Sequence, residues 1–517
     1  MRKFTRKIIK LCNEGEVYVM GDYILTIDEG TTSARAIVLN HEGDCVSVAS
    51  KEFKQYYPVS GWLEHDAEEI WETTMEVIKK VFINGKIKED DIKAIGIANQ
   101  RETTVVWDKH TGKPIYHAIV WGDRRTADFC DSLKSKGFEP MVKKKTGLVL
   151  DPFFSGTKIR WILDNVEGAR EKANRGDLLF SNIDGWIIWN LTGGKVHVTD
   201  YSNASRTLMF NINDLKWDND LLKMLDVPAS MLPEVKPSSG YFATTTEVFK
   251  KQIPITGVAG DQMAATFGQC CFEKGMFKYT YGTAGILEMN IGEKPIPSKH
   301  GLLTTIGWGL NGKVTYLMEG TVYNSGSAIQ WLRDECKFIN QYSETESFAS
   351  QADNKSEVYV VPAFTGLAAP YWDAYARGAI FGLSRGSGKN EIIRATLESL
   401  TYQTKDLIDA LAEDIGERFT LLKVDGGGCH SDVMNQFTAD LLNIDVERPK
   451  NVETTAAGAA YLAGLAVGYW SSMNDITSCR KIDRIFHPNM KELERNNRYK
   501  GWKRAVNATL AWSKDRN

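Results

Sequence analysis

Two stretches of similar pattern, about half a chain apart, constrain the fold of this protein more than any other feature. Each reads as a β-strand, a short turn rich in glycine and hydroxyl side chains, and a second strand, and they lie at residues 23–39 and 277–289. A repeat at this separation in 517 residues, too many for one hydrophobic core, predicts two duplicated α/β domains with a nucleotide cleft between them. We expect the domains to cover residues 23–270 and 271–517. Asp66 is predicted to cap a helix that begins at Ala67, and the Ala- and Gly-rich segment Thr454–Ala466 is predicted to form a closely packed helix.

The first turn has the chemistry of a phosphate-binding loop. Gly30 lets the backbone approach a ligand closely. A carboxylate beside a polyphosphate requires a cation between them, so Asp28 is predicted to face Mg²⁺. The groups that can donate to phosphate oxygens are Thr31, Thr32, Ser33 and Arg35. An ordinary hairpin is the alternative, and this segment alone does not decide between them.

Charged residues also follow two predicted strands, at Ile92–Ala98 and Ile253–Ala259. Ligands of open α/β sheets gather at such strand ends. Arg101 and Glu102 can recognise a diol, since one offers forked donors and the other two acceptors, or they can form a surface ion pair. Asp261 stands between a strand and a helix, where it is either a catalytic base or a simple N-cap.

Composition favours small-molecule chemistry. The formal charge of −3 and the 43% hydrophobic fraction give no reason to expect a nucleic-acid or membrane partner, and no apolar run is long enough to span a bilayer. Eight cysteines without a C-x-x-C pair are typical of reduced thiols, so we expect a cytoplasmic protein. Residues 1–22, which are rich in Lys and Arg, are expected to form an N-terminal extension.

Several further motifs give the chain a family resemblance. The Asp-x-Gly-Thr-Thr hairpin by itself resembles the whole superfamily of actin, sugar kinases and seventy-kilodalton chaperones. Other segments distinguish between the families of this superfamily: 61–66, 99–104, Trp121 with Arg124-Arg125, 153–165, 260–262, 363–366, 370–373 and 377–383. With them the chain, from Tyr23 to Trp512, resembles the FGGY family of carbohydrate kinases, and especially its glycerol-phosphorylating members. The resemblance implies two ribonuclease-H-like domains of the actin/hexokinase type and the ATP-dependent phosphorylation of glycerol to sn-glycerol 3-phosphate.

The resemblance also implies a site. ATP would be held at its phosphates by the first turn, through Thr31, Thr32, Ser33 and Arg35, and elsewhere by Thr283, Gly326, Gln330, Gly427 and Ser431. The polyol would be held by Arg101, Glu102, Trp121, Phe153, Asp261 and Gln262. Asp261 would be the general base, and Asp28 and Asp261 would hold Mg²⁺. A homo-oligomer, either a dimer or a tetramer, is expected.

Two alternatives remain open. Phe153 and Ile286 stand where the family pattern has Tyr and Phe, which makes an FGGY kinase for another polyol or a ketose credible. The other alternative is an actin- or chaperone-like ATPase. Arg101, Glu102 and Asp261 argue against it, because a nucleotide switch needs no polyol clamp.

Overall fold

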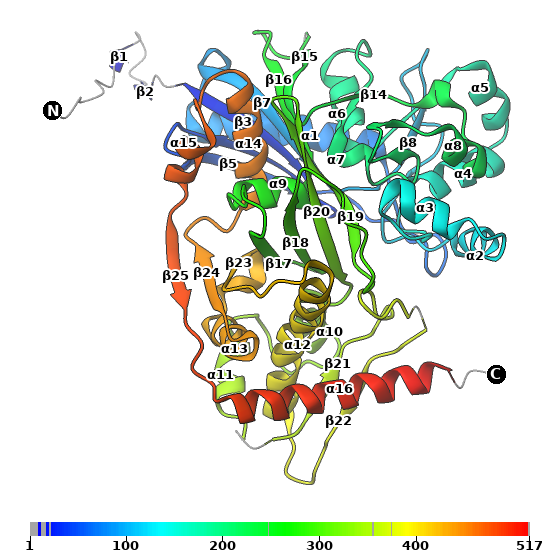
Figure 1. Ribbon diagram of the computed structural model, residues 1–517. Coiled ribbons are helices and arrows are strands. Elements are labelled where there is room, and N and C mark those ends of the chain that lie inside the picture. Colours follow the sequence, from blue (N-terminus) through cyan, green and yellow to red (C-terminus); the bar gives the residue numbers. More distant parts are fainter. Residues whose placement is uncertain are drawn as a thin grey trace.

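The computed structural model describes residues 9–11, 17–19 and 22–514, apart from 247, 354, 355 and 374. Two mixed β-sheets with helices on their faces form the framework (Figure 1). Most of the expected extension 1–22 lies outside the described residues, and within it β1 (Ile9–Leu11) pairs antiparallel with β2 (Val17–Val19). In the described part of the chain, no helix is both long and apolar enough to cross a membrane.

The first sheet has the strand order β15-β16-β7-β3-β4-β5. β3 pairs antiparallel with β4 and β4 with β5, whereas β7 runs parallel to both β3 and β16. The bounds are β3 (Tyr23–Glu29), β4 (Ser33–Leu39), β5 (Cys45–Glu52), β7 (Ile92–Asn99), β15 (Ser239–Thr244) and β16 (Pro254–Gly260). The first predicted hairpin is confirmed as β3–β4.

The second sheet has the order β19-β20-β18-β17-β23-β24-β25. β17 pairs antiparallel with β18 and β18 with β20, whereas β23 runs parallel to both β17 and β24. The bounds are β17 (Phe277–Tyr281), β18 (Gly285–Gly292), β19 (Leu303–Leu310), β20 (Lys313–Val322), β23 (Leu421–Asp425), β24 (Asp445–Pro449) and β25 (Ile482–Phe486). The series β5-β4-β3-β7-β16 and β20-β18-β17-β23-β24 therefore agree in order and direction, which confirms the predicted duplication.

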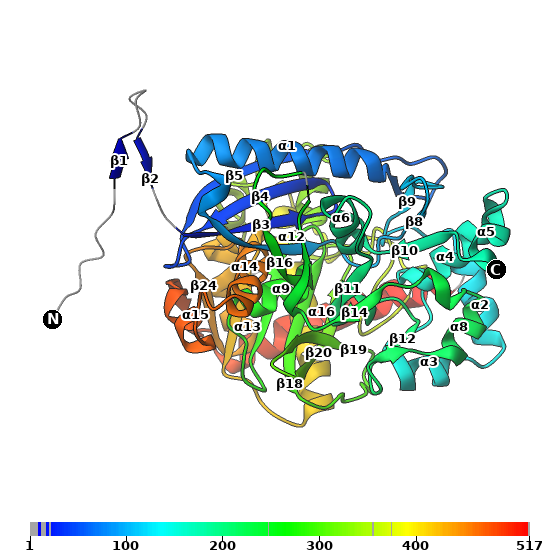
Figure 2. The same cartoon turned by 90° about the horizontal axis from the view of Figure 1, so that it is seen from above.

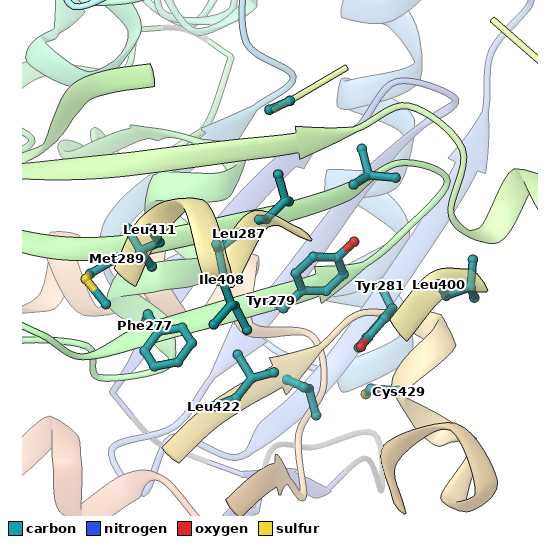
Figure 3. Close-up of a cluster of buried hydrophobic side chains, with 14 of the residues drawn as sticks. Phe277, Tyr279, Tyr281, Leu287, Met289, Leu400, Ile408, Leu411, Leu422 and Cys429 are labelled. Atoms are coloured by element: carbon teal, nitrogen blue, oxygen red, sulfur yellow. The ribbon is translucent and has the colours of Figure 1, made fainter. Parts of the chain in front are cut away.

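Long amphipathic helices cover the outer faces of both sheets. Figure 2 shows α1 (Ala67–Gly85) along the first sheet, where it shares a core with α6 (Ile183–Leu191). Asp66 caps α1 as predicted, because its Oδ1 accepts from Glu68 N at 2.9 Å. On the second sheet, α12 (Lys389–Ile415) buries its apolar side chains against those of β17, β18 and β23 (Figure 3).

Two helices lie between the sheets. α14 (Thr454–Ala466), predicted from its Ala and Gly content to pack closely, lies on β7 and β16 of the first sheet, and it also packs against α9 (Asp261–Gly268). A Cβ at Gly96 would lie 2.3 Å from Ala459 O, so the strand and helix backbones touch. A helix from the second half of the chain thus completes the core of the first sheet.

The remaining elements decorate this framework. Between β7 and β15 lie α2 (Ala127–Ser135), α3 (Glu139–Thr146), α4 (Ser155–Asn165), α5 (Ala169–Arg175), α7 (Tyr201–Ala204), α8 (Asn219–Leu225), β8 (Val105–Asp108), β9 (Ala118–Ile119), β10 (Leu178–Ser181), β11 (Val198–Asp200), β12 (Phe210–Asn211), β13 (Lys216–Trp217) and β14 (Glu234–Lys236). Elsewhere are β6 (Glu64–His65), α10 (Gly326–Asp334), α11 (Glu344–Ser350), β21 (Tyr359–Val361), β22 (Ala379–Phe381), α13 (Asp432–Leu442), α15 (Met473–Cys479) and α16 (Glu492–Lys514).

Candidate active site

The turn between β3 and β4 is tied to one of the predicted polyol residues. Trp121 Nε1 donates to Thr31 Oγ1 at 2.9 Å, and the Trp121 ring meets the Phe153 ring edge-on with centroids 5.6 Å apart. Because Thr31 Oγ1 accepts this bond, its own proton remains for donation to another acceptor. Thr32 is exposed and Ser33 half-buried, so the turn presents hydroxyls at the surface as predicted for phosphate binding.

The predicted phosphate ligand Arg35 is paired within the protein. Its Nη2 lies 2.6 Å from Asp28 Oδ2, and its Nη1 binds Glu453 at the start of α14. Asp28 is buried, and burial raises the pKa of its carboxyl group while Arg35 acts to lower it. Arg35 therefore lies over Asp28 on one face of the hairpin.

The chemistry of Asp28 and Asp261 fits the predicted Mg²⁺. The two carboxylates are close enough that Asp261 acts to raise the pKa of Asp28, and a cation between them would relieve this repulsion. Among the described residues, no cluster of three acidic, histidine or cysteine side chains forms a closed metal site. An ion held here would keep waters or phosphate oxygens as its other ligands, as Mg²⁺ commonly does.

Arg101 and Glu102 lie at the carboxyl end of β7, where Glu102 has a positive φ of 59°. This left-handed conformation is uncommon for a residue with a side chain and is often found at functional sites. The Glu102 carbonyl accepts from Ser155 Oγ at 3.1 Å, which fixes the loop. Both side chains are buried, so the alternative of a surface ion pair is wrong.

Asp261 begins α9, directly after β16. Its Oδ1 accepts from Gln262 N at 2.7 Å and lies 3.2 Å from Arg101 Nε, while 28% of the side chain is exposed. The N-cap position is occupied by Gly260, so Asp261 is the first residue of the helix and not its N-cap. Lys278 Nζ donates to Gln262 Oε1 at 2.6 Å and fixes the amide of the other predicted polyol residue on this helix.

A cavity of about 610 Å³ lies in the second half of the molecule. It contains all five residues that were predicted to bind the nucleotide beyond its phosphates: Thr283, Gly326, Gln330, Gly427 and Ser431. The predicted phosphate ligands of the first hairpin do not line it. The structure therefore brings together one of the two predicted groups of nucleotide residues, and the other group lies on the first sheet.

Two glycines of this cavity differ in what a side chain at their position would meet. Gly326 N donates to Gly282 O at 2.9 Å, and a Cβ at Gly326 would lie 2.7 Å from the same oxygen. Gly326 therefore lets the start of α10 pack on the turn of the second hairpin. A Cβ at Gly427 would meet nothing within 4 Å, so Gly427 leaves open space in the cavity.

Three charged residues of the site were missed at the sequence level. Glu346 on α11 lines the cavity and accepts from Ser431 Oγ at 2.6 Å. Glu319 on β20 and Arg206 after α7 are buried and bind each other at 2.9 Å. The signal for Glu319 was present, since it is a lone carboxylate within the mostly apolar run Tyr316–Val322.

Models of both domains of one family match most of the chain. The N-terminal domain of the FGGY family of carbohydrate kinases matches residues 23–268, and the C-terminal domain of this family matches residues 277–467. The chain belongs to the FGGY family of carbohydrate kinases. Its sheets, the cavity and the paired hairpins described above are accordingly the framework of a carbohydrate kinase.

Comparison with individual relatives gives more detail than the family match. The chain is 58% identical to the glycerol kinase of Petrotoga mobilis, over 96% of this chain and 100% of that protein, and 58% identical to the glycerol kinase of Caldanaerobacter subterraneus at the same coverage. The structure of Plasmodium falciparum glycerol kinase with ADP superposes with a TM-score of 0.88 at 36% identity, covering 95% of this chain and 98% of that one. A xylulose kinase from Lactobacillus acidophilus, at 23% identity and a TM-score of 0.85 over 96% of this chain and 99% of that one, shares the fold.

Proposed function

We propose that this protein transfers the γ-phosphoryl group of ATP to glycerol and forms sn-glycerol 3-phosphate. The observation that carries the proposal is the cavity, because five residues from separate segments, each expected to bind the nucleotide, line one space of about 610 Å³. The choice of glycerol is supported by the glycerol kinases that match the chain at 58% identity over nearly its whole length.

The proposed mechanism places the adenosine in the cavity and the phosphates beyond Thr283, toward the turn Thr31–Ser33. Turn hydroxyls and backbone amides donate to the phosphate oxygens. Asp28 and Asp261 would hold Mg²⁺, which would neutralise charge on the phosphates.

Asp261 is the proposed general base. The described residues bind its Oδ1, which leaves Oδ2 to accept the proton of the attacking hydroxyl. Arg101 donates to the polyol and Glu102 accepts from it, while Trp121, Phe153 and Gln262 complete the walls. The hydroxyl oxygen then attacks the γ-phosphorus in line, and the bond from this phosphorus to the β,γ-bridging oxygen breaks, so that ADP leaves.

The second candidate is an FGGY kinase for another polyol or a ketose, which Phe153 and Ile286 favour. Loss of a tyrosine hydroxyl at position 153 removes one neutral hydrogen bond, worth about 0.5–1.5 kcal/mol, or roughly two- to tenfold in affinity. Ile286 in place of Phe widens the pocket, and apolar walls discriminate weakly. We therefore expect glycerol to be phosphorylated with a KM several-fold above that of typical relatives, and four-carbon polyols or glyceraldehyde to act as side substrates.

One assay decides between the two candidates. ADP release is coupled to a spectrophotometric reaction and measured with glycerol, glyceraldehyde, erythritol and xylulose. We expect the highest kcat/KM with glycerol. A compound that exceeds glycerol at least about tenfold, a difference of about 1.4 kcal/mol in transition-state binding, would replace it as the substrate.

The proposal also includes a domain boundary at residues 270/271, a cytoplasmic location and a homo-oligomer, either dimer or tetramer. The boundary is supported by the gap between the two family matches, which end at 268 and resume at 277. Analytical ultracentrifugation measures the oligomeric state.

A further inference from the structure

Five buried or half-buried side chains form one chain of alternating charge. Glu102 Oε1 lies 2.5 Å from Arg206 Nε, and Arg206 Nη2 lies 2.9 Å from Glu319 Oε1. The other oxygen of Glu319, Oε2, binds Arg101 Nη1. Arg101 Nε in turn lies 3.2 Å from Asp261 Oδ1. The chain thus runs from the expected polyol acceptor to the expected base, with Glu319 at its centre.

The chain has little freedom to rearrange. The side chains of Arg206 and Glu319 are fully buried, and those of Arg101 and Glu102 are 4% and 2% exposed. A buried ion that loses its partner is strongly destabilised, because no water replaces the lost interaction. Displacement of one member therefore forces displacement of its neighbours, and the spacing of Glu102 and Asp261 depends on the members between them.

Glu319 is the member that comes from the other sheet. Arg101 and Glu102 follow β7, Arg206 follows α7 and Asp261 begins α9, and all four belong to the part of the chain that matches the N-terminal domain, residues 23–268. Glu319 lies on β20 of the second sheet, which also carries the hairpin β17–β18 beside the cavity. One carboxylate of the second sheet therefore holds two arginines of the first half.

We propose that Glu319 is a positioning residue that sets the separation of Glu102 and Asp261, and hence the placement of the acceptor hydroxyl against the transferred phosphoryl group. The inference rests on the proposed function, because it assigns the two ends of the chain to the polyol. Glu319 accepts charge-assisted bonds from the guanidinium groups of Arg101 and Arg206 and thereby aligns both arginines. The polyol itself is bound by other residues. Polyol binding and proton abstraction then depend on Glu319, although Glu319 contacts neither the polyol nor the proton that is removed.

Glu288 provides a matched control. It lies directly opposite Glu319 in the β18–β20 pairing and is buried too. Its Oε2 binds Thr266 and lies 3.7 Å from Lys278 Nζ, and its Oε1, which has no hydrogen-bond partner among the described residues, lies 3.8 Å from Arg101 Nη1. Burial raises the pKa of Glu288, whereas for Glu319 the two arginines outweigh burial and lower it. Glu288→Gln keeps the size of the side chain and an oxygen that accepts from Thr266, so it tests the loss of a buried carboxylate that lies near Arg101 without a hydrogen bond to it.

The test compares Glu319→Gln, Glu319→Asp and Glu288→Gln with the wild type. We measure KM and kcat for glycerol, the Kd of ADP by calorimetry, and Tm. For Glu319→Gln we expect kcat/KM to fall about a hundredfold, with a higher KM and a lower kcat, since misplacement by about 1 Å costs this much. Glu319→Asp keeps the charge on a shorter stem and should recover part of the loss. The Kd of ADP should stay within about twofold of the wild-type value in all three variants, because neither residue lines the cavity.

The outcomes separate this inference from the proposed function. If the wild type prefers another polyol, the proposed function fails, and the same variants are measured with that polyol. If Glu319→Gln does not fold, Glu319→Asp decides. The inference is overturned if folded Glu319 variants keep kcat/KM within about twofold of the wild type, if Glu288→Gln loses as much as Glu319→Gln, or if ADP binding weakens in parallel with activity.

Discussion

Arg35 Nη2 lies 2.6 Å from Asp28 Oδ2, directly across the first hairpin. From the sequence, these residues were expected to serve oppositely charged parts of one ligand, phosphate and Mg²⁺. In the structure each neutralises the other. A bound polyphosphate with its cation would therefore replace an existing ion pair, and the free energy of that exchange is part of nucleotide affinity.

We expect loss of Arg35 alone to destabilise the protein more than loss of Asp28 and Arg35 together. Arg35→Gln leaves a buried carboxylate without its cation, and we expect a loss of about 3–5 kcal/mol in the free energy of unfolding. Asp28→Asn combined with Arg35→Gln should lose less than the single Arg35 variant, because no buried charge remains. Urea denaturation of the single and double variants measures this coupling, and equal losses would contradict it.

Glu29 should make stability depend on pH. Burial raises the pKa of its carboxyl group from 4.5 to about 8, so the folded protein holds a proton that the unfolded chain releases. This stabilisation is complete below about pH 4.5 and is lost as the pH rises through about 8. The geometry agrees: Thr74 Oγ1 donates to Glu29 Oε1 at 2.7 Å but also lies 2.7 Å from Ile70 O, and Glu29 Oε2 has no hydrogen-bond partner among the described residues, so little stabilises a charged carboxylate.

Glu29→Gln should remove that dependence. Between pH 5 and pH 8 the free energy of unfolding of the wild type should fall by about 1 kcal/mol per pH unit more than that of the variant, since unfolding releases the proton that folded Glu29 holds. Denaturation curves at several pH values, with Glu68→Gln on the exposed face of α1 as control, measure the slopes. Parallel slopes for the wild type and Glu29→Gln would show that Glu29 is ionised in the folded protein.

Gly427 and Gly326 should separate nucleotide binding from folding. Gly427→Val places methyl groups in open cavity space, so the KM for ATP should rise about tenfold or more while Tm stays within about 2 °C. Gly326→Ala forces the α10 terminus away from Gly282 O and should lower Tm as well. Calorimetric binding of ADP and thermal melts distinguish the two. Unchanged ATP kinetics of the Gly427→Val protein would show that the cavity is not part of the nucleotide-binding site.

Asp261→Asn tests the proposed base. An amide cannot accept the hydroxyl proton, so kcat should fall about a hundredfold or more. The Kd of ADP, measured without Mg²⁺, should be unchanged, because Asp261 does not line the cavity. Asp128→Asn, at an exposed position on α2, is the control. Near-normal turnover of the Asp261→Asn variant would show that Asp261 is not the general base.

Local sequence was sufficient for the elements that depend on local chemistry. The strands and turns of both hairpins, the Asp66 cap and the close-packing helix Thr454–Ala466 were predicted from propensity, turn residues and side-chain size, and the structure confirms them. The family motifs gave the duplicated fold, which the strand order confirms.

Ion pairs between residues far apart in the sequence could not be predicted from local sequence patterns. Arg35 was predicted to face phosphate because its neighbours along the chain are turn residues, but its partner Glu453 is 418 positions away. Glu319 was missed for the same reason, since a carboxylate in an apolar strand gives no indication of its partners in another domain. The assignments of the individual site residues stay predictions, which the variants above test.

The packing of α14 on the first sheet has a consequence for how the protein is made. The ribosome completes β7 and β16 when fewer than 270 residues have been joined, but the helix that covers one face of these strands begins at Thr454. Domains of many proteins fold in order as they emerge. Here the first half cannot bury its inner face until nearly the whole chain has been synthesised, so its final folding step follows translation of the second half.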